Sequence, residues 1–458
     1  MPLDVLNPFD QSLVCSLDHD EGAALEAKIA AAHSAAEGWR QVPLQERIEQ
    51  VRQGLERFRA SSEQIAVDVS RQMGKPITQA RGEINTVFAR ADHMLEIAPQ
   101  ALSAELLPPV DDFQRRIEHA PLGVVFNLAA WNYPLVIPVN VIVPALAAGN
   151  TVLLKHSAKT PLCGQAFEEA FGELDVPGLV TNLVLTHETT AGVIADPRVN
   201  HLSFTGSVEG GRAVYRQAAE RFIDVGLELG GKDPAYIARD ADLDFAIANT
   251  VDGACYNAGQ SCCAVERVYV HQSLLDDYLA GAREALEAYH PGDPLEEETT
   301  IGPLASRGAL DFLEEQVRDA VSRGAELLAG GARTPDCAGN FFQPTLLAGV
   351  PNEAAAMQEE SFGPILPVLA VSSDEEALTH MRDTRFGLTA SIWTSDQERA
   401  EHFASSLDAG TIFQNRCDFL DPALPWTGYG DSGKGSTLSS YGYLHLTRRK
   451  SIHFRTNT

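Results

Sequence analysis

Glu228 and Cys262 are the two residues whose types and surroundings point most clearly to chemistry. Residues 222–229 alternate in hydropathy and include β-branched side chains, which predicts a strand that stops at Gly230-Gly231. A carboxylate near the end of an otherwise apolar strand is costly unless it is paired or its charge is useful. Glu228 is therefore a candidate base.

Cys262 follows a predicted helix that begins after Asp240 and ends at residues 257–260. At such a bend, backbone N–H groups can point outward and stabilise a thiolate or an oxyanion. The competing interpretation is that Cys255, Cys262 and Cys263 are small core residues, as cysteines usually are. Taken alone, the cysteine favours the core interpretation.

Two motifs together favour chemistry. Residues 228–232 read Glu-Leu-Gly-Gly-Lys and residues 259–262 read Gly-Gln-Ser-Cys. This combination resembles the two active-site signatures of the aldehyde dehydrogenase superfamily, and the resemblance covers roughly residues 20–450. It implies oxidation of an aldehyde to the carboxylic acid with NAD or NADP, through a thiohemiacetal and a thioester on Cys262. Glu228 would then activate the water that hydrolyses the thioester.

Asn132 lies in Trp131-Asn132-Tyr133-Pro134. On residue types alone it is a turn residue before a helix that starts at proline. The resemblance implies instead that its amide stabilises the oxyanion together with the backbone N–H of Cys262. Family members that pass the acyl group to coenzyme A generally lack an acid at the position of Glu228, so water is the expected acyl acceptor.

The composition excludes several classes of protein. With 458 residues, 44% of them hydrophobic, the chain can bury a large core and divide into two or three domains. Its 63 acidic and 35 basic residues give a net charge of −28, which argues against nucleic acid or an anionic membrane as partner. Seven scattered cysteines and the lack of a signal peptide or an apolar span predict a cytoplasmic protein. None of the 13 histidines has metal-ligand spacing with the cysteines, so we expect no metal site.

Short buried strands alternate with helical segments in the first half of the chain. We predict strands at 123–128, 151–155, 181–186, 201–204 and 222–228. This is the βαβ pattern of an α/β fold with a doubly wound parallel sheet, which binds ligands at the carboxyl ends of its strands. The polar candidates fall at those ends.

The resemblance implies three parts of the chain. Residues 1–100 and 121–230 would form the NAD(P)-binding domain and residues 231–425 an α/β catalytic domain. Residues 101–120 and 440–458 would form a β-hairpin oligomerisation element, which predicts a homodimer or homotetramer.

Three further segments can be assigned from their patterns. Residues 1–20 are polar and are expected to be irregular, whereas residues 21–98 have helical periodicity. Residues 266–270 are expected to begin the first strand of the second α/β block.

Glycine and serine at positions 206 and 207 follow a predicted strand and open a helix. Alone they are a plain turn with an N-cap, but the resemblance implies a pyrophosphate at this helix N-terminus. Lys155 could simply be solvated, and the resemblance implies that it bonds the adenosine ribose. The cofactor residues implied are Leu128, Trp131, Lys155, Ser157, Gly206, Ser207, Leu229, Glu360 and Phe362.

Ala158 stands where NAD-preferring members commonly carry a glutamate that holds the ribose hydroxyls. Without that carboxylate a 2′-phosphate is not repelled, and Ser157 with Lys159 would favour it. We therefore expect NADP to be accepted.

The resemblance also implies a substrate channel, lined by Tyr133, Val136, Asn140, Tyr256, Ser261, Phe419 and Leu420. This set is mainly apolar, which favours an aliphatic or aromatic aldehyde as the small-molecule partner. One alternative is a succinic semialdehyde-type dehydrogenase, with Arg416 or another arginine binding the carboxylate. A remoter alternative is a catalytically silent binding or structural relative, but such a protein is expected to lack the thiol, the asparagine or the glutamate.

Overall fold

The computed structural model describes residues 2–172, 174, 176–335 and 339–457. The chain begins with an antiparallel hairpin of β1 (Leu3–Leu6) and β2 (Leu13–Leu17). The prediction that residues 1–20 are irregular was therefore wrong. The hairpin is too short to show a pattern, and it is held by a distant segment: the ring of Phe9 packs edge-on against Phe341, with centroids 6.1 Å apart.

Helices follow over the segment where helical periodicity predicted them. They are α1 (Gly22–Trp39), α2 (Leu44–Ala60), α3 (Ser62–Met73) and α4 (Ile77–Ala101). The indole N–H of Trp39 donates to the carbonyl of Leu146 at 2.9 Å, which ties α1 to the body.

In the part of the chain that the structure describes, a six-stranded sheet has the order β19-β9-β8-β5-β6-β7. All neighbouring pairs are parallel except β19 with β9. The strands are β5 (Val124–Ala129), β6 (Thr151–His156), β7 (Val180–Asn182), β8 (Val199–Thr205), β9 (Asp224–Glu228) and β19 (Gly433–Lys434). The strand expected at 181–186 is shorter, because the backbone of Val184 bonds Asp20 instead of a neighbouring strand.

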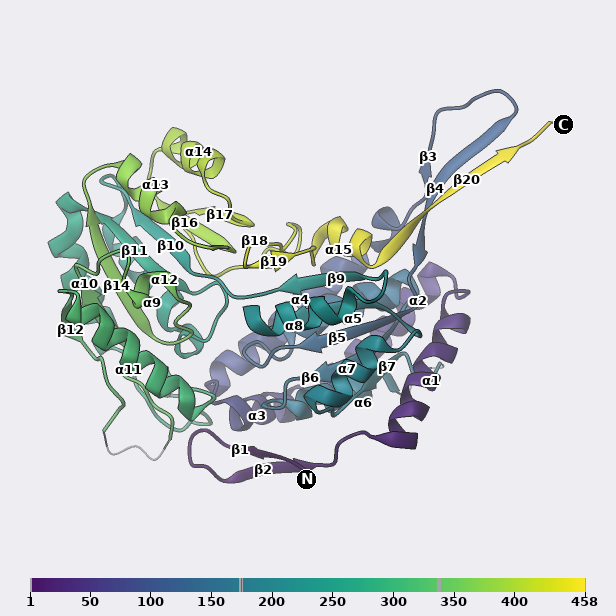
Figure 1. Ribbon diagram of the computed structural model, residues 1–458, viewed down its shortest axis with the longest axis horizontal. Helices are drawn as coiled ribbons and strands as arrows, with labels where there is room; N and C mark the ends of the chain where they lie inside the picture. Colours follow the sequence, from purple (N-terminus) through teal and green to yellow (C-terminus); the bar gives the residue numbers. More distant parts are fainter. Residues whose placement is uncertain (1, 173, 175, 336–338, 458) are drawn as a thin grey trace.

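Alternation along the strands explains why helices cover both faces of this sheet. On β5, Val124 and Phe126 belong to a core with α1, α7 and α8, whereas Val125 belongs to the core under α2, α4, α5 and α6. The connecting helices are α5 (Val136–Ala148), α6 (Pro161–Gly172), α7 (His187–Ala195) and α8 (Val208–Ala218). Figure 1 shows α7 and α8 on one side of the strands.

A second sheet of the described residues has seven strands in the order β12-β13-β14-β11-β10-β16-β17. They are β10 (Asp233–Ile237), β11 (Val265–His271), β12 (Glu326–Ala329), β13 (Thr345–Ala348), β14 (Ile365–Val371), β16 (Thr389–Trp393) and β17 (Thr411–Gln414). Its first strand is thus β10 and not the predicted 266–270 segment. β10 was missed because it starts only a few residues after β9, directly behind the glycine pair.

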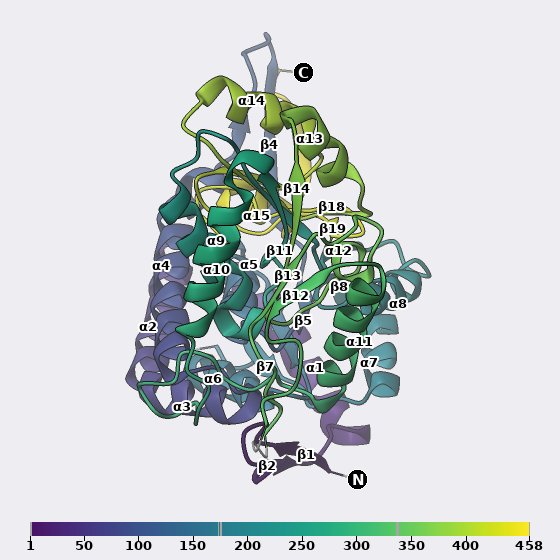
Figure 2. The same cartoon turned by 90° about the vertical axis from the view of Figure 1, so that its left-hand side faces the viewer.

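Helices also sandwich the second sheet, as Figure 2 shows with α9 and α10 on one side and α11 on the other. They are α9 (Leu243–Cys255), α10 (Leu275–Glu287), α11 (Arg307–Ser322), α12 (Ala355–Gln358), α13 (Asp374–Arg382) and α14 (Gln397–Ser406). Ala235 and Ile237 of β10 face α9 and α10, and Tyr236 between them faces the opposite core.

A long arm projects from the body and carries the C-terminus (Figure 1). In it, β4 (Phe113–Pro121) pairs antiparallel with β20 (Thr447–Arg455), and β3 (Glu105–Leu106) pairs with β4. The preceding α15 (Ser439–His445) packs on α4, where the hydroxyl of Tyr443 donates to the carbonyl of Met94 at 2.7 Å. The first part of the 440–458 segment therefore lies in the body, and the arm proper begins at Thr447.

The α/β fold class predicted from the sequence is confirmed. Parallel strands with helices on both faces form two sheets, and the carboxyl end of β9 leads directly into β10. The glycine pair between these strands brings Glu228 to the junction of the two layered units.

Candidate active site

Two cavities meet at Cys262. A wide cavity of about 330 Å³ and a narrow one of about 190 Å³ are both lined by Thr205, Glu228 and Cys262. Asn132 also lines the narrow cavity. The three side chains to which the sequence assigned the chemistry, at 132, 228 and 262, thus surround one space although they come from separate segments.

The loop that carries Cys262 leaves the end of α9 through an unusual backbone. Asn257 and Ala258 have φ of 51° and 55°, and Gly259 follows at 72°. Consecutive left-handed residues turn the chain sharply, and such conformations persist only where the surroundings hold them. The side-chain amide of Asn257 supplies part of that hold, because it donates to the carbonyls of Asn132 and Gln260 at 3.0 and 3.1 Å.

Two glycines allow the motifs to approach each other. A Cβ on Gly231 would lie 2.5 Å from the carbonyl oxygen of Cys262, and a Cβ on Gly259 would lie 2.3 Å from the backbone of Gly363. Both positions must therefore lack a side chain. This close packing explains why Glu-Leu-Gly-Gly and Gly-Gln-Ser-Cys occur together in the sequence.

Glu228 ends β9 and is held by two hydroxyl groups. Its Oε1 accepts a hydrogen bond from Thr437 at 2.6 Å and its Oε2 accepts one from Thr205 at 2.9 Å. Burial raises the pKa of Glu228, and the two hydroxyls act in the opposite direction. A carboxylate with a raised pKa is suited to accept a proton near neutral pH.

Cys263, beside the candidate nucleophile, is a different kind of thiol. Its Sγ donates to Oδ1 of Asp418 at 3.1 Å, and only 3% of the residue is exposed. Contact with the side chain of Cys262, burial and the charge of Asp418 raise the pKa of Cys263 well above its ordinary value. Cys262, which is partly exposed, is therefore the more available of the two for nucleophilic attack.

A buried ion pair holds the start of α5, a few residues after Asn132. Lys75 and Glu83 form a buried salt bridge, and Oε1 of Glu83 accepts the backbone N–H groups of Leu135 and Val136 at 2.7 and 3.1 Å. These bonds satisfy donors at the start of α5. Asn132 itself is 3% exposed.

The narrow cavity unites most of the predicted cofactor residues. Trp131, Gly206, Ser207, Leu229, Glu360 and Phe362 all line it. Ser207 caps α8 by accepting the N–H of Gly210 at 3.2 Å, so N–H groups at this helix end face the cavity region. The rings of Trp131 and Phe362 meet edge to face, with centroids 5.4 Å apart.

Glu360 is the most informative member of this group. Burial raises its pKa to about 8, and its Oε1 accepts the N–H of Gly231 at 3.2 Å. The loop around it is fixed by Glu266, which accepts the N–H groups of Ser361 and Phe362 and pairs with Lys232 at 2.7 Å. A buried carboxyl group aimed into a cavity fits the hydroxyls of a ribose, so the residues present suit a nicotinamide dinucleotide.

Leu128, Lys155 and Ser157 do not line the narrow cavity. Lys155 is one residue before the end of β6, and its Nζ donates to the carbonyl of His156 at 3.3 Å. Lys159 contacts one of the residues that line the narrow cavity, because its Nζ lies 4.0 Å from the ring centre of Trp131. Burial lowers the pKa of Lys159 to about 8. The roles assigned to Leu128, Lys155 and Ser157 stay predictions.

Most of the residues predicted to line the substrate channel line the wide cavity, together with several charged residues. Tyr133, Val136, Asn140, Tyr256, Phe419 and Leu420 line it. Ser261 does not, because it is 1% exposed and its hydroxyl donates to Asp418 at 2.9 Å. The surface of the cavity is mainly apolar, as expected, but its lining also includes polar and charged residues that were not expected, namely Glu83, Arg90, Asn249, Asp252 and Asp418.

The arginine that the sequence suggested as a carboxylate ligand does not line the wide cavity, whereas another arginine does. Arg416 is not among the lining residues, since its guanidinium stacks on the ring of Phe419 at 3.4 Å. Arg90 of α4 does line the cavity. Sequence reasoning missed it because α4 was interpreted only as a packing helix. The available signal was an arginine on the apolar face of the helix that also carries Val87 and Met94.

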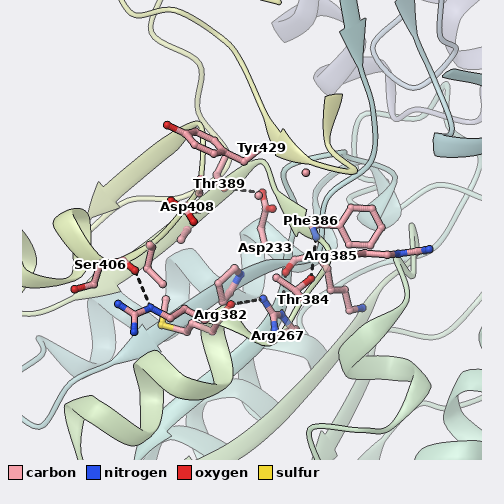
Figure 3. Close-up of a pocket in the computed structure, with 18 residues that line it drawn as sticks. Asp233, Arg267, Arg382, Thr384, Arg385, Phe386, Thr389, Ser406, Asp408 and Tyr429 are labelled. Carbon is pink, nitrogen blue, oxygen red and sulfur yellow. Dashed lines mark hydrogen bonds between the residues drawn. The ribbon is translucent and has the colours of Figure 1, made fainter. Parts of the chain in front are cut away.

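A third cavity, of about 370 Å³, lies between β10, β11, β16 and the ends of α13 and α14 (Figure 3). It is rich in cationic side chains, but they are occupied. Arg382 donates to the carbonyl of Ser406 at 2.7 Å (Figure 3). Arg385 pairs with Glu359 at 2.8 Å. Neither the thiol nor Glu228 reaches this cavity.

In the described residues, no helix is both long and apolar enough to cross a bilayer. Residues 1–452 match the family model described as the aldehyde dehydrogenase family.

Individual relatives agree with this match. The chain is 35% identical to an NADP(+) succinate-semialdehyde dehydrogenase of Deinococcus radiodurans, over 98% of this chain and 94% of that protein. It is 32% identical to a betaine aldehyde dehydrogenase of Bacillus subtilis, over 99% and 94%.

A solved structure shows that the fold is also similar to that of this family. Succinic semialdehyde dehydrogenase from Streptococcus pyogenes, in complex with NADP+, matches with a TM-score of 0.94 and 31% identity over 98% of this chain and 99% of that chain. The chain thus belongs to the aldehyde dehydrogenase family and is an oxidoreductase that uses NAD or NADP to oxidise an aldehyde to its carboxylic acid.

Proposed function

We propose that Cys262 attacks the aldehyde, that Asn132 stabilises the resulting oxyanion, and that Glu228 activates the water that releases the acid. The observation that supports this most strongly is that all three side chains line the narrow cavity, which also carries the cofactor candidates. Their residue types match the needs of the reaction, which are a nucleophile, an amide donor and a base.

The reaction begins when Sγ of Cys262 forms a bond to the carbonyl carbon. The oxygen gains charge, which the amide of Asn132 and the backbone N–H of Cys262 stabilise, at roughly 3 kcal/mol for each donor. When bound, the nicotinamide supplies the hydride acceptor. A thioester on Cys262 remains, Glu228 takes a proton from water, and the hydroxide equivalent displaces the thiol to give the carboxylic acid.

The cofactor residues proposed to act directly are Trp131, Gly206, Ser207, Leu229, Glu360 and Phe362, which line the narrow cavity. NADP is proposed to be accepted because Ala158 offers no carboxylate against a 2′-phosphate and Lys159 lies against Trp131. Replacing Ala158 by Glu should lower kcat/KM for NADP by about 10-fold or more, since like charges would face each other.

Steady-state kinetics with each dinucleotide measures this change, and Ala158→Gln is the matched control because it adds similar bulk without charge. A wild-type kcat/KM for NAD far above that for NADP would contradict the proposed acceptance.

The proposed chemistry is tested by incubating the protein with a panel of aldehydes and either dinucleotide, and by following reduced nicotinamide and acid release. Stoichiometric formation of both products supports the assignment. Labelling of Cys262 by iodoacetamide should abolish the formation of both products. Activity that survives complete labelling of that thiol would overturn the role of Cys262.

The assembly and its compartment are also proposals. The projecting arm carries exposed apolar side chains, such as Leu106 at 80% and Phe454 at 54% exposure, which a second copy of the chain would cover in a homodimer or homotetramer. Free cysteines at all six positions that the described residues contain favour the cytoplasm. Analytical ultracentrifugation measures the oligomeric state. A shortened chain that ends before Thr447 should form smaller oligomers than the full chain.

A further inference from the structure

Arg90 is buried without the partners that a buried charge requires. Only 7% of the residue is exposed. Nη1 donates to Oδ1 of Asn140 at a long 3.4 Å, and Nε has no hydrogen-bond partner among the described residues. No ion pair within the described chain includes this guanidinium, which has five N–H donors. Such a group is costly to bury unless a ligand completes it.

The position of Arg90 shows where that ligand would be. Arg90 and Asn140 line the wide cavity together with Cys262, so the guanidinium group and the thiol belong to side chains around one space. The hydrogen bond that Nη1 donates to Asn140 orients one edge of the guanidinium. The planar fork of arginine matches the two oxygens of a carboxylate.

The charges of Glu83 and Glu228 favour the charged form of Arg90, but among the described residues no acid around the cavity accepts a hydrogen bond from it. Each of these acids has other donors. Glu83 pairs with Lys75, and Glu228 accepts hydrogen bonds from Thr205 and Thr437. Asp418 accepts from Ser261 and Cys263. Asp252, which also lines the cavity, accepts from Tyr289 at 3.5 Å.

From this arrangement we infer that Arg90 binds a carboxylate at the far end of the substrate, so that the preferred substrates are short aldehydes with a terminal carboxylate. A singly charged carboxylate suits the cavity better than a phosphate, because the acids on the walls would repel a second negative charge. The inference rests on the proposed function, since it assumes that Cys262 receives the aldehyde end of the same molecule.

The test compares three aldehydes of four carbons that differ in the charge of the far end. They are 4-oxobutanoate, butanal and 4-aminobutanal, and the measured quantity is kcat/KM for each with the wild-type enzyme. The expected order is anionic, then neutral, then cationic. A preference for the cationic aldehyde, or equal values for all three, overturns the inference.

Arg90→Met and Arg90→Lys then locate the effect. The ratio of kcat/KM for 4-oxobutanoate to that for butanal should fall by about 100-fold in Arg90→Met, with the loss mainly in KM, and Arg90→Lys should restore part of it. A change that slows the oxidation of both aldehydes equally cancels in this ratio. Arg71→Met, at an exposed position of α3 that does not line the cavity, is the matched control, and its ratio should equal that of the wild type.

The outcomes separate the inference from the proposed function. If butanal is oxidised through Cys262 and the ratio is unchanged in Arg90→Met, the carboxylate site is wrong and the chemistry stands. If no aldehyde is oxidised by the wild type, the proposed function itself fails. If the Arg90 variants do not fold, inhibition of butanal oxidation in the wild type tests the carboxylate site instead. Succinate should compete with butanal, and the uncharged succinamide should compete far less. Equal inhibition by both compounds would overturn the inference.

Discussion

The wide cavity and the cavity of Figure 3 each contain a buried arginine, and the two arginines are in opposite states. Arg267 is 0% exposed and donates to the carbonyls of Lys232, His380 and Met381 and to the hydroxyl of Tyr269, at 2.9 to 3.3 Å. Arg90 has a single long bond, to Asn140. A saturated arginine holds loops together, whereas an unsaturated one in a cavity is available to a ligand.

The same contrast applies to the acids. Asp233 in the cavity of Figure 3 accepts the hydroxyl of Thr389 at 2.6 Å, and burial raises its pKa well above the ordinary value. Glu228 is also buried and bonded, yet it shares its cavity with a thiol. Burial and a shifted pKa are therefore common to both regions. What distinguishes the narrow cavity is the partly exposed thiol of Cys262 beside the buried carboxyl group, as the proposed chemistry requires.

The largest expected effect is on the nucleophile. Cys262→Ser should lower kcat by about 10⁴-fold or more, because a hydroxyl without a paired base is a poor nucleophile. Initial rates of reduced nicotinamide formation measure this. Cys15→Ser is the control, since Cys15 lies on β2, far along the chain from both cavities, and it should keep wild-type rates. Substantial turnover by Cys262→Ser would remove the distinction drawn between the two cavities.

Glu228→Gln should have the next largest effect. Turnover should fall by roughly 10²- to 10⁴-fold, while the first burst of hydride transfer persists, because the base is needed for thioester hydrolysis and not for attack by the thiol. Rapid-mixing kinetics separates the burst from the steady state. The exposed Glu220→Gln serves as control.

The pH profile gives a second test of Glu228. Its pKa is raised by burial, and a base works only when deprotonated, so kcat of the wild type should fall as the pH drops through that raised pKa. Glu228→Gln should lack this limb. A profile that is identical in both proteins would assign the titration to another group.

Much of this could be predicted from the sequence, for reasons visible in particular residues. Glu228 and Cys262 were identifiable because Gly231 and Gly259 must stay small where the two loops pack, so the motifs are continuous stretches. The charged residues of the wide cavity were not predictable. Arg90, Asp252 and Asp418 come from α4, α9 and a loop, and only the tertiary arrangement brings them together. The N-terminal hairpin was missed for the same reason, since Phe341 holds it from a distance.

Arg267→Met should mainly affect stability. It leaves the carbonyls of Lys232, His380 and Met381 buried without their donor, which costs about 3 to 5 kcal/mol of unfolding free energy. Urea denaturation of the purified protein measures this. The ratio of kcat/KM for 4-oxobutanoate to that for butanal should stay at the wild-type value. A change in that ratio would show that the cavity of Figure 3 also selects substrates.

Arg90→Met should have the smallest effect on stability, and this effect should be opposite in sign to that of Arg267→Met. Burial lowers the pKa of Arg90, which reflects the cost of holding its charge away from water. Methionine removes that cost and fills most of the space, so unfolding free energy should stay the same or rise by up to about 2 kcal/mol. Urea denaturation without substrate measures it beside Arg267→Met. A loss as large as that of Arg267→Met would mean that Arg90 is a structural residue, and the contrast between the two arginines would fail.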